Sequence, residues 1–303
     1  MSVPSYILID TASLLFRAFY ALPPMTTTSG VPTSALYGTC SLLLKVLREH
    51  GRPGVRLAFA REGRRRGEAT FRHVLWPDYK AGRPPTPAPL VEQLQRFDEL
   101  AQALGVPVVR APGFEADDVL ATLAAAHPAA EVLVVSGDAD LLATATARGD
   151  GPGVRVLFVG RRARDHVLVD AAGLSARYGV ARTAIPLLRA FVGDPSDNIP
   201  GLAGVGPKTA VRWIERHGTL AGIVAAARHG GLGRLSGRVV EHADVLPRWV
   251  EVLTLRTDLP IPSLAAATAL PDLHGFQAMF EELEFRSLVK RLPAVRKALE
   301  NPG

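Results

Sequence analysis

The sequence predicts an α/β protein, with a central, mostly parallel sheet flanked by helices and then a smaller helical region. Along the first half, short apolar runs alternate with helical patterns, as in proteins whose helices connect parallel strands. Acidic residues follow several of these runs. After about Val169 the pattern changes to short helices and loops without strands. The 303 residues are 48% hydrophobic and 21% charged, which is typical of a folded protein.

The individual elements follow from these patterns. The apolar runs predict strands over residues 6–9, 55–59, 106–109 and 131–135. Helical spacing predicts helices over residues 34–48, 90–104 and 116–126. Within the first of these helices lies Cys40, the single cysteine, which we expect to be a small buried residue. One cysteine excludes an internal disulfide framework and suits a reducing compartment.

Acidic residues gather where the predicted strands end. Asp10 follows the first strand and Asp138 follows the fourth, while Glu115, Asp117 and Asp118 open the helix after the third. Ligands of parallel sheets bind beyond the carboxyl ends of the strands, so we expect these acids to converge. Each alone could be a helix cap or a first-turn acid. Several of them at equivalent strand ends favour a divalent-cation site.

A long basic connection, residues 61–89, lies between the second strand and the next long helix. It is rich in Arg, Gly and Pro, and connections of this length inside a domain are usually functional or disordered. We expect it to grip phosphates beside the acidic edge. The arginine clusters of the chain are Arg61, Arg64, Arg65 and Arg66, and then Arg161, Arg162 and Arg164. A net charge of +6 adds weak support for a polyanionic partner.

A glycine-rich segment follows an acid pair at residues 194–197. The spacing of Gly201, Gly204 and Gly206 lets backbone amides approach a phosphate, and a helix beginning near Lys208 points its N-terminus there. A tight turn alone could also use such glycines. Their position between an acid pair and a lysine favours a clamp on a nucleic-acid backbone.

Taken together, these segments resemble the bacterial 5′-nuclease, or flap endonuclease, family: the 5′-nuclease domain of DNA polymerase I and its stand-alone relatives. The matching segments are residues 7–10, 17–19, 79–87, 113–121, 136–141, 192–198, 199–210 and 283–288. They cover nearly the whole chain in the family's order. The resemblance implies a PIN-like α/β nuclease domain with a helical arch over residues 1–168. It also implies a helical helix–three-turn–helix region over 169–290 and a tail over 291–303. Since no polymerase-like sequence follows, we expect a free-standing nuclease.

The resemblance implies a metal-dependent, structure-specific nuclease that hydrolyses DNA at 5′ ends and 5′ flaps, in replication or repair. Two or more Mg²⁺ or Mn²⁺ ions are expected, the nearer held by Asp10, Glu115, Asp117 and Asp118 and the second by Asp138, Asp140, Asp194 and Asp197. The implied catalytic residues are Lys80, Arg83, Asp10 and Asp118. The implied DNA contacts are Arg17, Tyr79, Lys80, Arg83, Gly201, Gly204, Gly206, Lys208 and Thr209. The helix–three-turn–helix element is a candidate site for K⁺.

Two tyrosines have a second interpretation. Tyr79 or Tyr20 could stack on an unpaired base, or each could pack in the core.

One position departs from the family pattern. Ala60 stands where the family usually has an aspartate after the second strand. Glu62 or a water could replace that ligand, or the first cation could bind more weakly. The main alternative is therefore a branched-DNA binding protein whose nuclease activity is weakened or lost. A ribonuclease toxin or a small-molecule phosphatase would leave the basic connection and the glycine segment unexplained.

The remaining expectations concern location and partners. No apolar stretch approaches transmembrane length, and the N-terminal run lacks the basic region of an export signal. We therefore expect a cytoplasmic protein with DNA as its partner, no membrane association and no organic cofactor. The sequence has no coiled-coil pattern, so a monomer is expected.

Overall fold

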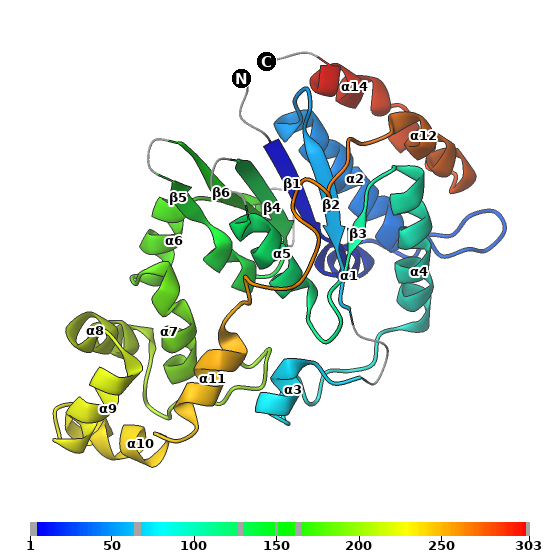
Figure 1. The fold of residues 1–303 in the computed structure, drawn as a ribbon. Coiled ribbons are helices and arrows are strands. Elements are labelled where there is room, and N and C mark those ends of the chain that lie inside the picture. The colour runs from blue at the N-terminus through cyan, green and yellow to red at the C-terminus, as the bar shows by residue number, and fades with distance from the viewer. Residues whose placement is uncertain (1–4, 64–67, 127–129, 149–150, 161–164, 301–303) are drawn as a thin grey trace. The chain divides into compact units, whose positions relative to one another are not determined.

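The computed structural model describes residues 5–63, 68–126, 130–148, 151–160 and 165–300, and the chain divides into two compact units (Figure 1). The first unit consists of residues 1–63, 85–171 and 256–303, and the second of 64–84 and 172–255. Most of the basic connection therefore belongs to the second unit. The arginines at 64–66 and at 161, 162 and 164 lie outside the described residues.

The first unit is built on a mixed sheet, which among the described residues has seven strands. They are β1 (Ser5–Asp10), β2 (Arg56–Ala60), β3 (Val108–Val109), β4 (Glu131–Ser136), β5 (Thr146–Arg148), β6 (Gly151–Phe158) and β7 (Val167–Val169). The order is β3-β2-β1-β4-β6-β5, with β7 also on β6, and only β5 and β7 run antiparallel to β6. The predicted mostly parallel sheet is confirmed, and β5, β6 and β7 are strands that the apolar runs did not reveal.

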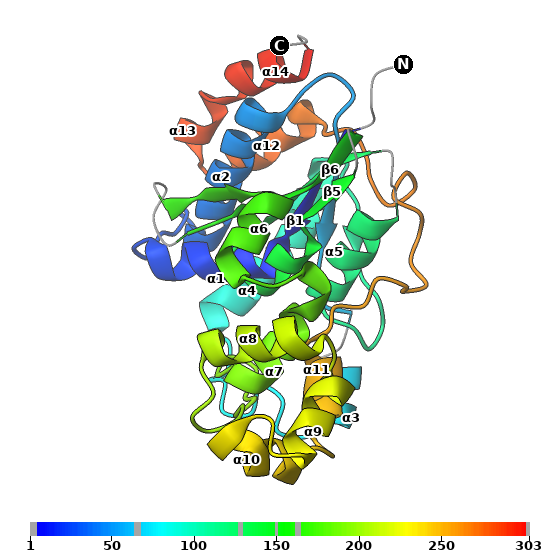
Figure 2. The ribbon, with the colours of Figure 1, turned by 90° about the vertical axis from the view of Figure 1, so that its left-hand side faces the viewer.

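Helices cover both faces of this sheet. They are α1 (Thr11–Ala21), α2 (Ser34–His50), α4 (Ala88–Ala103), α5 (Ala116–Ala125), α12 (Leu273–Glu282), α13 (Arg286–Val289) and α14 (Leu292–Glu300). Alternate residues of the central strands, such as Ile7 and Ile9, form one buried core with α1, α2, α4 and the C-terminal helices. On the opposite face α5 packs against β1, β2 and β4 (Figures 1 and 2).

The helix α2 shows why the predicted pattern holds. Its periodic leucines, among them Leu36 and Leu47, are fully buried in the core. Cys40 is buried on the same helix, and burial raises the pKa of its thiol, so it is a structural residue. By contrast, α1 was not predicted. It begins directly after β1 because Asp10 caps it, accepting a hydrogen bond from Ser13 N at 3.2 Å.

The second unit is helical. Its helices are α3 (Phe71–Leu75), α6 (Ala171–Tyr178), α7 (Ile185–Val192), α8 (Pro207–His217), α9 (Leu220–Arg228), α10 (Ser236–Glu241) and α11 (Leu246–Leu253). Helix α7 packs against α8 and α11, with Phe191 edge-on to Trp213 at 5.6 Å between ring centroids. As predicted, no sheet strand occurs after Val169 in the described part of the chain.

A membrane-spanning element is missing from the part of the chain that the structure describes. None of its helices combines the length and the apolar character needed to cross a bilayer.

Candidate metal centre and nucleic-acid interface

The carboxyl ends of the central strands form one edge of the first unit. Asp10 is the last residue of β1 and pairs in register with Ala60, the last residue of β2. On its other side β1 runs parallel to β4, with Ile9 opposite Val135. Asp138 follows β4 by two residues. The parallel register therefore places the ends that carry Asp10 and Asp138 on neighbouring strands.

A hydroxyl group links these two strand ends. Ser136 Oγ donates to Asp10 Oδ2 at 2.5 Å and accepts a hydrogen bond from Asp138 N at 2.8 Å. Asp138 Oδ1 in turn accepts from Asp140 N at 2.9 Å, which starts the 3₁₀ turn Asp140–Thr144. Asp10 is buried, whereas Asp138 and Asp140 are half-buried and reachable from solvent.

The acids at the start of α5 are less alike than the sequence suggests. Asp118 is fully buried, and its two oxygens accept hydrogen bonds from Arg256 N at 3.0 Å and Glu115 N at 3.3 Å. It therefore caps α5 and anchors the chain at Arg256. Glu115 is also buried, and Asp117 is half-buried.

The region around Ala60 contains no acid in register with Asp10. Ala60 is fully buried, and Arg61 points to α4, where it donates to Leu94 O at 2.9 Å and to Asp98 Oδ1 at 2.7 Å. Glu62 is half-buried, two residues beyond the strand end.

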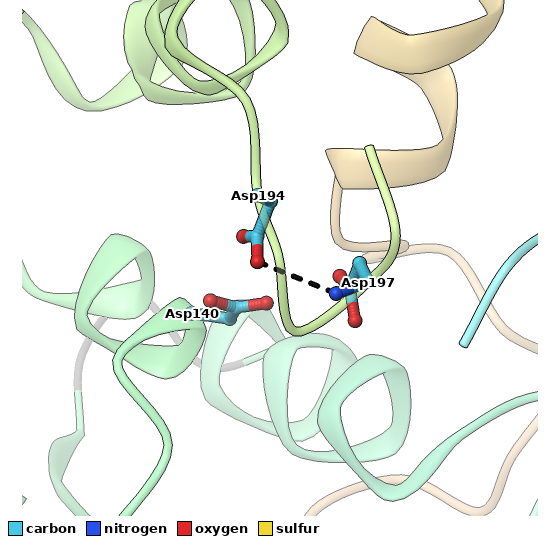
Figure 3. A group of neighbouring side chains, drawn as sticks. All are labelled: Asp140, Asp194 and Asp197. Carbon is cyan, nitrogen blue, oxygen red and sulfur yellow. Dashed lines mark hydrogen bonds between the residues drawn. The ribbon is translucent and has the colours of Figure 1, made fainter. Parts of the chain in front are cut away.

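The second unit carries the other acid pair in a tight loop. Asp194 and Ile199 exchange both backbone hydrogen bonds, at 2.7 and 2.9 Å. Asp194 Oδ1 accepts from Ser196 N at 2.9 Å and from Asp197 N at 3.3 Å (Figure 3), while Arg189 pairs with Asp194 Oδ2. The Asp194 carboxylate therefore holds the loop together from inside.

Two basic residues of the connection lie beside this loop. Lys80 Nζ is 3.9 Å and Arg83 Nη2 3.6 Å from Asp197 Oδ1. The backbone keeps them there, since Lys80 N donates to Asp197 O at 3.3 Å and Lys80 adopts a left-handed φ of 54°. Tyr79 is buried against His73, so its ring packs within the unit, whereas Tyr20 in the first unit is exposed.

The glycines of the predicted phosphate clamp have different roles. At Gly201 a Cβ would lie 2.4 Å from Gly193 N, so this glycine permits a close approach within the protein. Gly206 has open space around it and caps α8. Among the hydrogen bonds of the described residues, the N–H groups of Gly206 and Lys208 have no acceptor. They stand exposed at the helix N-terminus, as phosphate binding requires.

The oxygen atoms available as metal ligands at the strand-end edge suit a hard divalent cation. They are carboxylate oxygens, which Mg²⁺ and Mn²⁺ prefer, and Asp138 and Asp140 present theirs at half-buried positions.

The sequence analysis did not anticipate the roles of Ser136, Ser13 and Arg189. The sequence feature that could have identified Ser136 is its hydroxyl group directly before Gly137 and Asp138. Arg17, expected at a phosphate, donates to Gly137 O at 2.6 Å.

The fold is a mixed α/β sheet domain with acids at the strand ends, followed by a helical part. The chain belongs to the 5′-3′ exonuclease family: residues 5–179 match the family's N-terminal resolvase-like domain, and residues 180–274 match its C-terminal SAM fold. It is 36% identical over 285 residues to the thermostable DNA polymerase I of Thermus thermophilus, covering 93% of this chain and 32% of the relative. It is 35% identical over 298 residues to DNA polymerase I of Mycobacterium tuberculosis, covering 95% and 31%. The chain thus spans about a third of the length of these relatives.

Solved structures share the fold at low sequence identity. T5 5′-exonuclease with bound zinc is 18% identical, with a TM-score of 0.62 and coverage of 98% of this chain and 100% of that one. The catalytic core of Rad2 in complex with DNA substrate is 17% identical, with a TM-score of 0.61 and coverage of 97% and 92%. Human GEN1 in complex with Holliday junction DNA is 17% identical, with a TM-score of 0.59 and coverage of 97% and 74%.

Proposed function

We propose that this chain is a metal-dependent, structure-specific 5′-nuclease that hydrolyses DNA phosphodiester bonds at 5′ ends and 5′ flaps, in replication or repair. The observation that carries the proposal is the pair of acids at neighbouring strand ends, Asp10 and Asp138, in a chain whose two parts both match the family. We further propose that the protein acts as a cytoplasmic monomer with DNA as its partner.

The cations of the proposal are Mg²⁺ or Mn²⁺, two or more in number. When bound, such ions activate a water and stabilise negative charge on the scissile phosphate. Mg²⁺ uses only one or two carboxylates directly and keeps several waters. Asp10, Asp117, Asp138 and Asp140 are therefore the proposed direct ligands of the first unit. Asp118 accepts hydrogen bonds from the N–H groups of Glu115 and Arg256, which belong to two separate segments, so we assign it to holding these segments together.

The second unit supplies the remaining groups. Asp197 is its proposed ligand, while Asp194 shapes the loop that carries it. Lys80 and Arg83, held beside Asp197, are the proposed contacts of the scissile phosphate, where a positioned positive charge stabilises the developing negative charge.

Duplex DNA would be held away from the reacting bond. The exposed N–H groups of Gly206 and Lys208 and the side chains of Lys208 and Thr209 are the proposed phosphate contacts, and the carbonyls nearby are a proposed K⁺ site. Contacts of this kind position a duplex without reading its sequence, so the preference would be for shape. Exposed Tyr20 is the better candidate for stacking on an unpaired base, since Tyr79 is buried.

The alternative of a branched-DNA binding protein with weakened or lost nuclease activity, here called the binding-only alternative, depends on Ala60. A buried alanine in register with Asp10 offers no cation ligand. Because some of the acids would act through water, we propose that the site still assembles without a carboxylate at this position.

Cleavage of a 5′-labelled flap duplex tests the proposal. Wild-type protein with Mn²⁺ or Mg²⁺ is expected to cut near the junction, and EDTA is expected to stop it. Asp138→Ala should lower the rate by more than the roughly 10- to 100-fold typical of outer-shell partners, because Asp138 is a proposed direct ligand. The matched control is Asp244→Ala, which removes an exposed acid of the second unit and should leave the rate unchanged.

Two other results would change the assignment. Tight flap binding without cutting in either metal would support the binding-only alternative. Equal cutting by wild type and Asp138→Ala would contradict the proposed site.

A further inference from the structure

Ser136 occupies a position between the two strand-end acids. Its side chain is fully buried at the end of β4. A serine hydroxyl has one proton and two lone pairs, and a carboxylate can only accept. The hydroxyl must therefore donate to Asp10 Oδ2, at 2.5 Å, and use a lone pair for Asp138 N, at 2.8 Å. Both partners are thus tied to one oxygen atom.

Helix α1 also forms hydrogen bonds with the turn at Gly137 and Asp138, which follows Ser136. Ser13 Oγ accepts from Gly137 N at 3.0 Å, and Arg17 Nη2, one helical turn later, donates to Gly137 O at 2.6 Å. Ser13 N also donates to the second oxygen of Asp10, Oδ1, at 3.2 Å. A Cβ on Gly137 would lie 2.2 Å from Arg17 Nε, so a side chain at this position would displace the guanidinium. Asp10 and the Gly137–Asp138 turn are therefore held by one hydrogen-bonded network.

We propose that Ser136 is a positioning residue that sets the placement of Asp10 relative to the Asp138–Asp140 turn before any cation binds. The inference rests on the proposed function, because it assumes that these acids bind divalent cations. Two carboxylate groups close together repel each other without a cation, and a buried hydroxyl that bonds to both segments keeps them in place. Outer-shell partners of metal ligands act in this way by orienting the ligands.

Direct Mn²⁺ binding to the full chain without DNA tests this role, by titration calorimetry or electron paramagnetic resonance. Ser136→Ala is expected to weaken Mn²⁺ binding by about 10- to 100-fold. The matched control is Thr144→Ala: this hydroxyl is also buried, at the end of the 3₁₀ turn that starts at Asp140, but donates to Leu141 O at 2.7 Å. Its Mn²⁺ affinity should stay at the wild-type value. Ser136→Thr keeps the hydroxyl and should recover most of the affinity.

The outcomes separate this inference from the proposed function. If wild type binds Mn²⁺ and cuts flaps but Ser136→Ala binds Mn²⁺ equally well, only the positioning role is overturned. If wild type binds no Mn²⁺, both are overturned. Should Ser136→Ala fail to fold, Ser13→Ala decides, because Ser13 is half-buried and acts on the same turn. Weaker Mn²⁺ binding than in Thr144→Ala supports the proposal, and equal binding overturns it.

Discussion

At the scale of single residues, Ala60 is the position where the expected strand-end acid is missing. It is fully buried and paired in register with Asp10. A methyl group there leaves the end of β2 without an acid and spares Asp10 a like-charged neighbour. The metal-free protein thus avoids a buried repulsion that a second carboxylate would introduce.

Ala60→Asp should therefore couple stability to the cation. In EDTA we expect the free energy of unfolding to fall by about 1–3 kcal/mol, because a polar group is buried beside Asp10. Saturating Mn²⁺ should raise the melting temperature of the variant more than that of wild type, since the cation offsets the repulsion. Thermal melting with and without Mn²⁺ measures both effects.

The matched control is Ala60→Asn, which has nearly the same shape and no added charge. It should lose stability in EDTA but gain no more from Mn²⁺ than wild type does. An Ala60→Asp variant that Mn²⁺ stabilises no more than wild type would mean that position 60 is remote from any bound cation.

At the scale of elements, the contact between α3 and α11 holds the basic connection within the second unit. Arg72 of α3 is buried and donates from Nε to Val252 O near the end of α11, at 2.8 Å. Trp76 and Trp249 pack edge-on beside it, at 5.8 Å between centroids. A cation at a helix C-terminus is favourable because the last carbonyls lack partners. This anchor lies eight residues before Lys80.

Arg72→Met should loosen this anchor while preserving much of the side-chain volume. Leaving buried carbonyl groups without a donor is expected to cost about 1–3 kcal/mol in the free energy of unfolding. Chemical denaturation measures the loss. The matched control is Arg248→Met on α11, an exposed arginine, which should change stability by less than about 0.5 kcal/mol. Equal stability of the two variants would contradict a structural role for Arg72.

At the scale of the whole molecule, the charge distribution is uneven. The net charge is +6, although acids are concentrated at the strand-end edge of the first unit. Such a protein can attract a polyanion over its surface and still keep an acidic site for cations. Binding to DNA by phosphate contacts releases counterions, so affinity should fall steeply as salt rises.

Lys208→Ala should reduce this salt dependence. If Lys208 contacts one phosphate, the slope of log affinity against log salt concentration should decrease in magnitude by about 1. Fluorescence anisotropy with a flap duplex at several salt concentrations, in Ca²⁺ or EDTA, measures the slope. Lys290→Ala removes an exposed lysine of the first unit and serves as the matched control. Equal slopes for the two variants would exclude Lys208 from the DNA contact.

Local patterns were sufficient for the central elements. The four predicted strands correspond to β1–β4 and the three predicted helices to α2, α4 and α5, because their apolar periodicity matches the faces they bury. Helix α1 was missed since its start depends on a strand residue, Asp10, acting as a cap. Strands β5 and β7 were missed because they are short, and both pair antiparallel with β6, away from the central parallel strands. Strand β6 was missed with them.

The sequence by itself determined the fold class, the edge at which Asp10 and Asp138 lie, and the family. These follow from spacing along the chain and from the rule that parallel strands end at one edge. Only the tertiary structure decided which polar atoms are already engaged: Asp118 and Asp194 bind backbone N–H groups, and Arg17 binds Gly137. The bond from Ser136 to Asp10 joins residues 126 positions apart. Packing brings such partners together, and no local pattern records them.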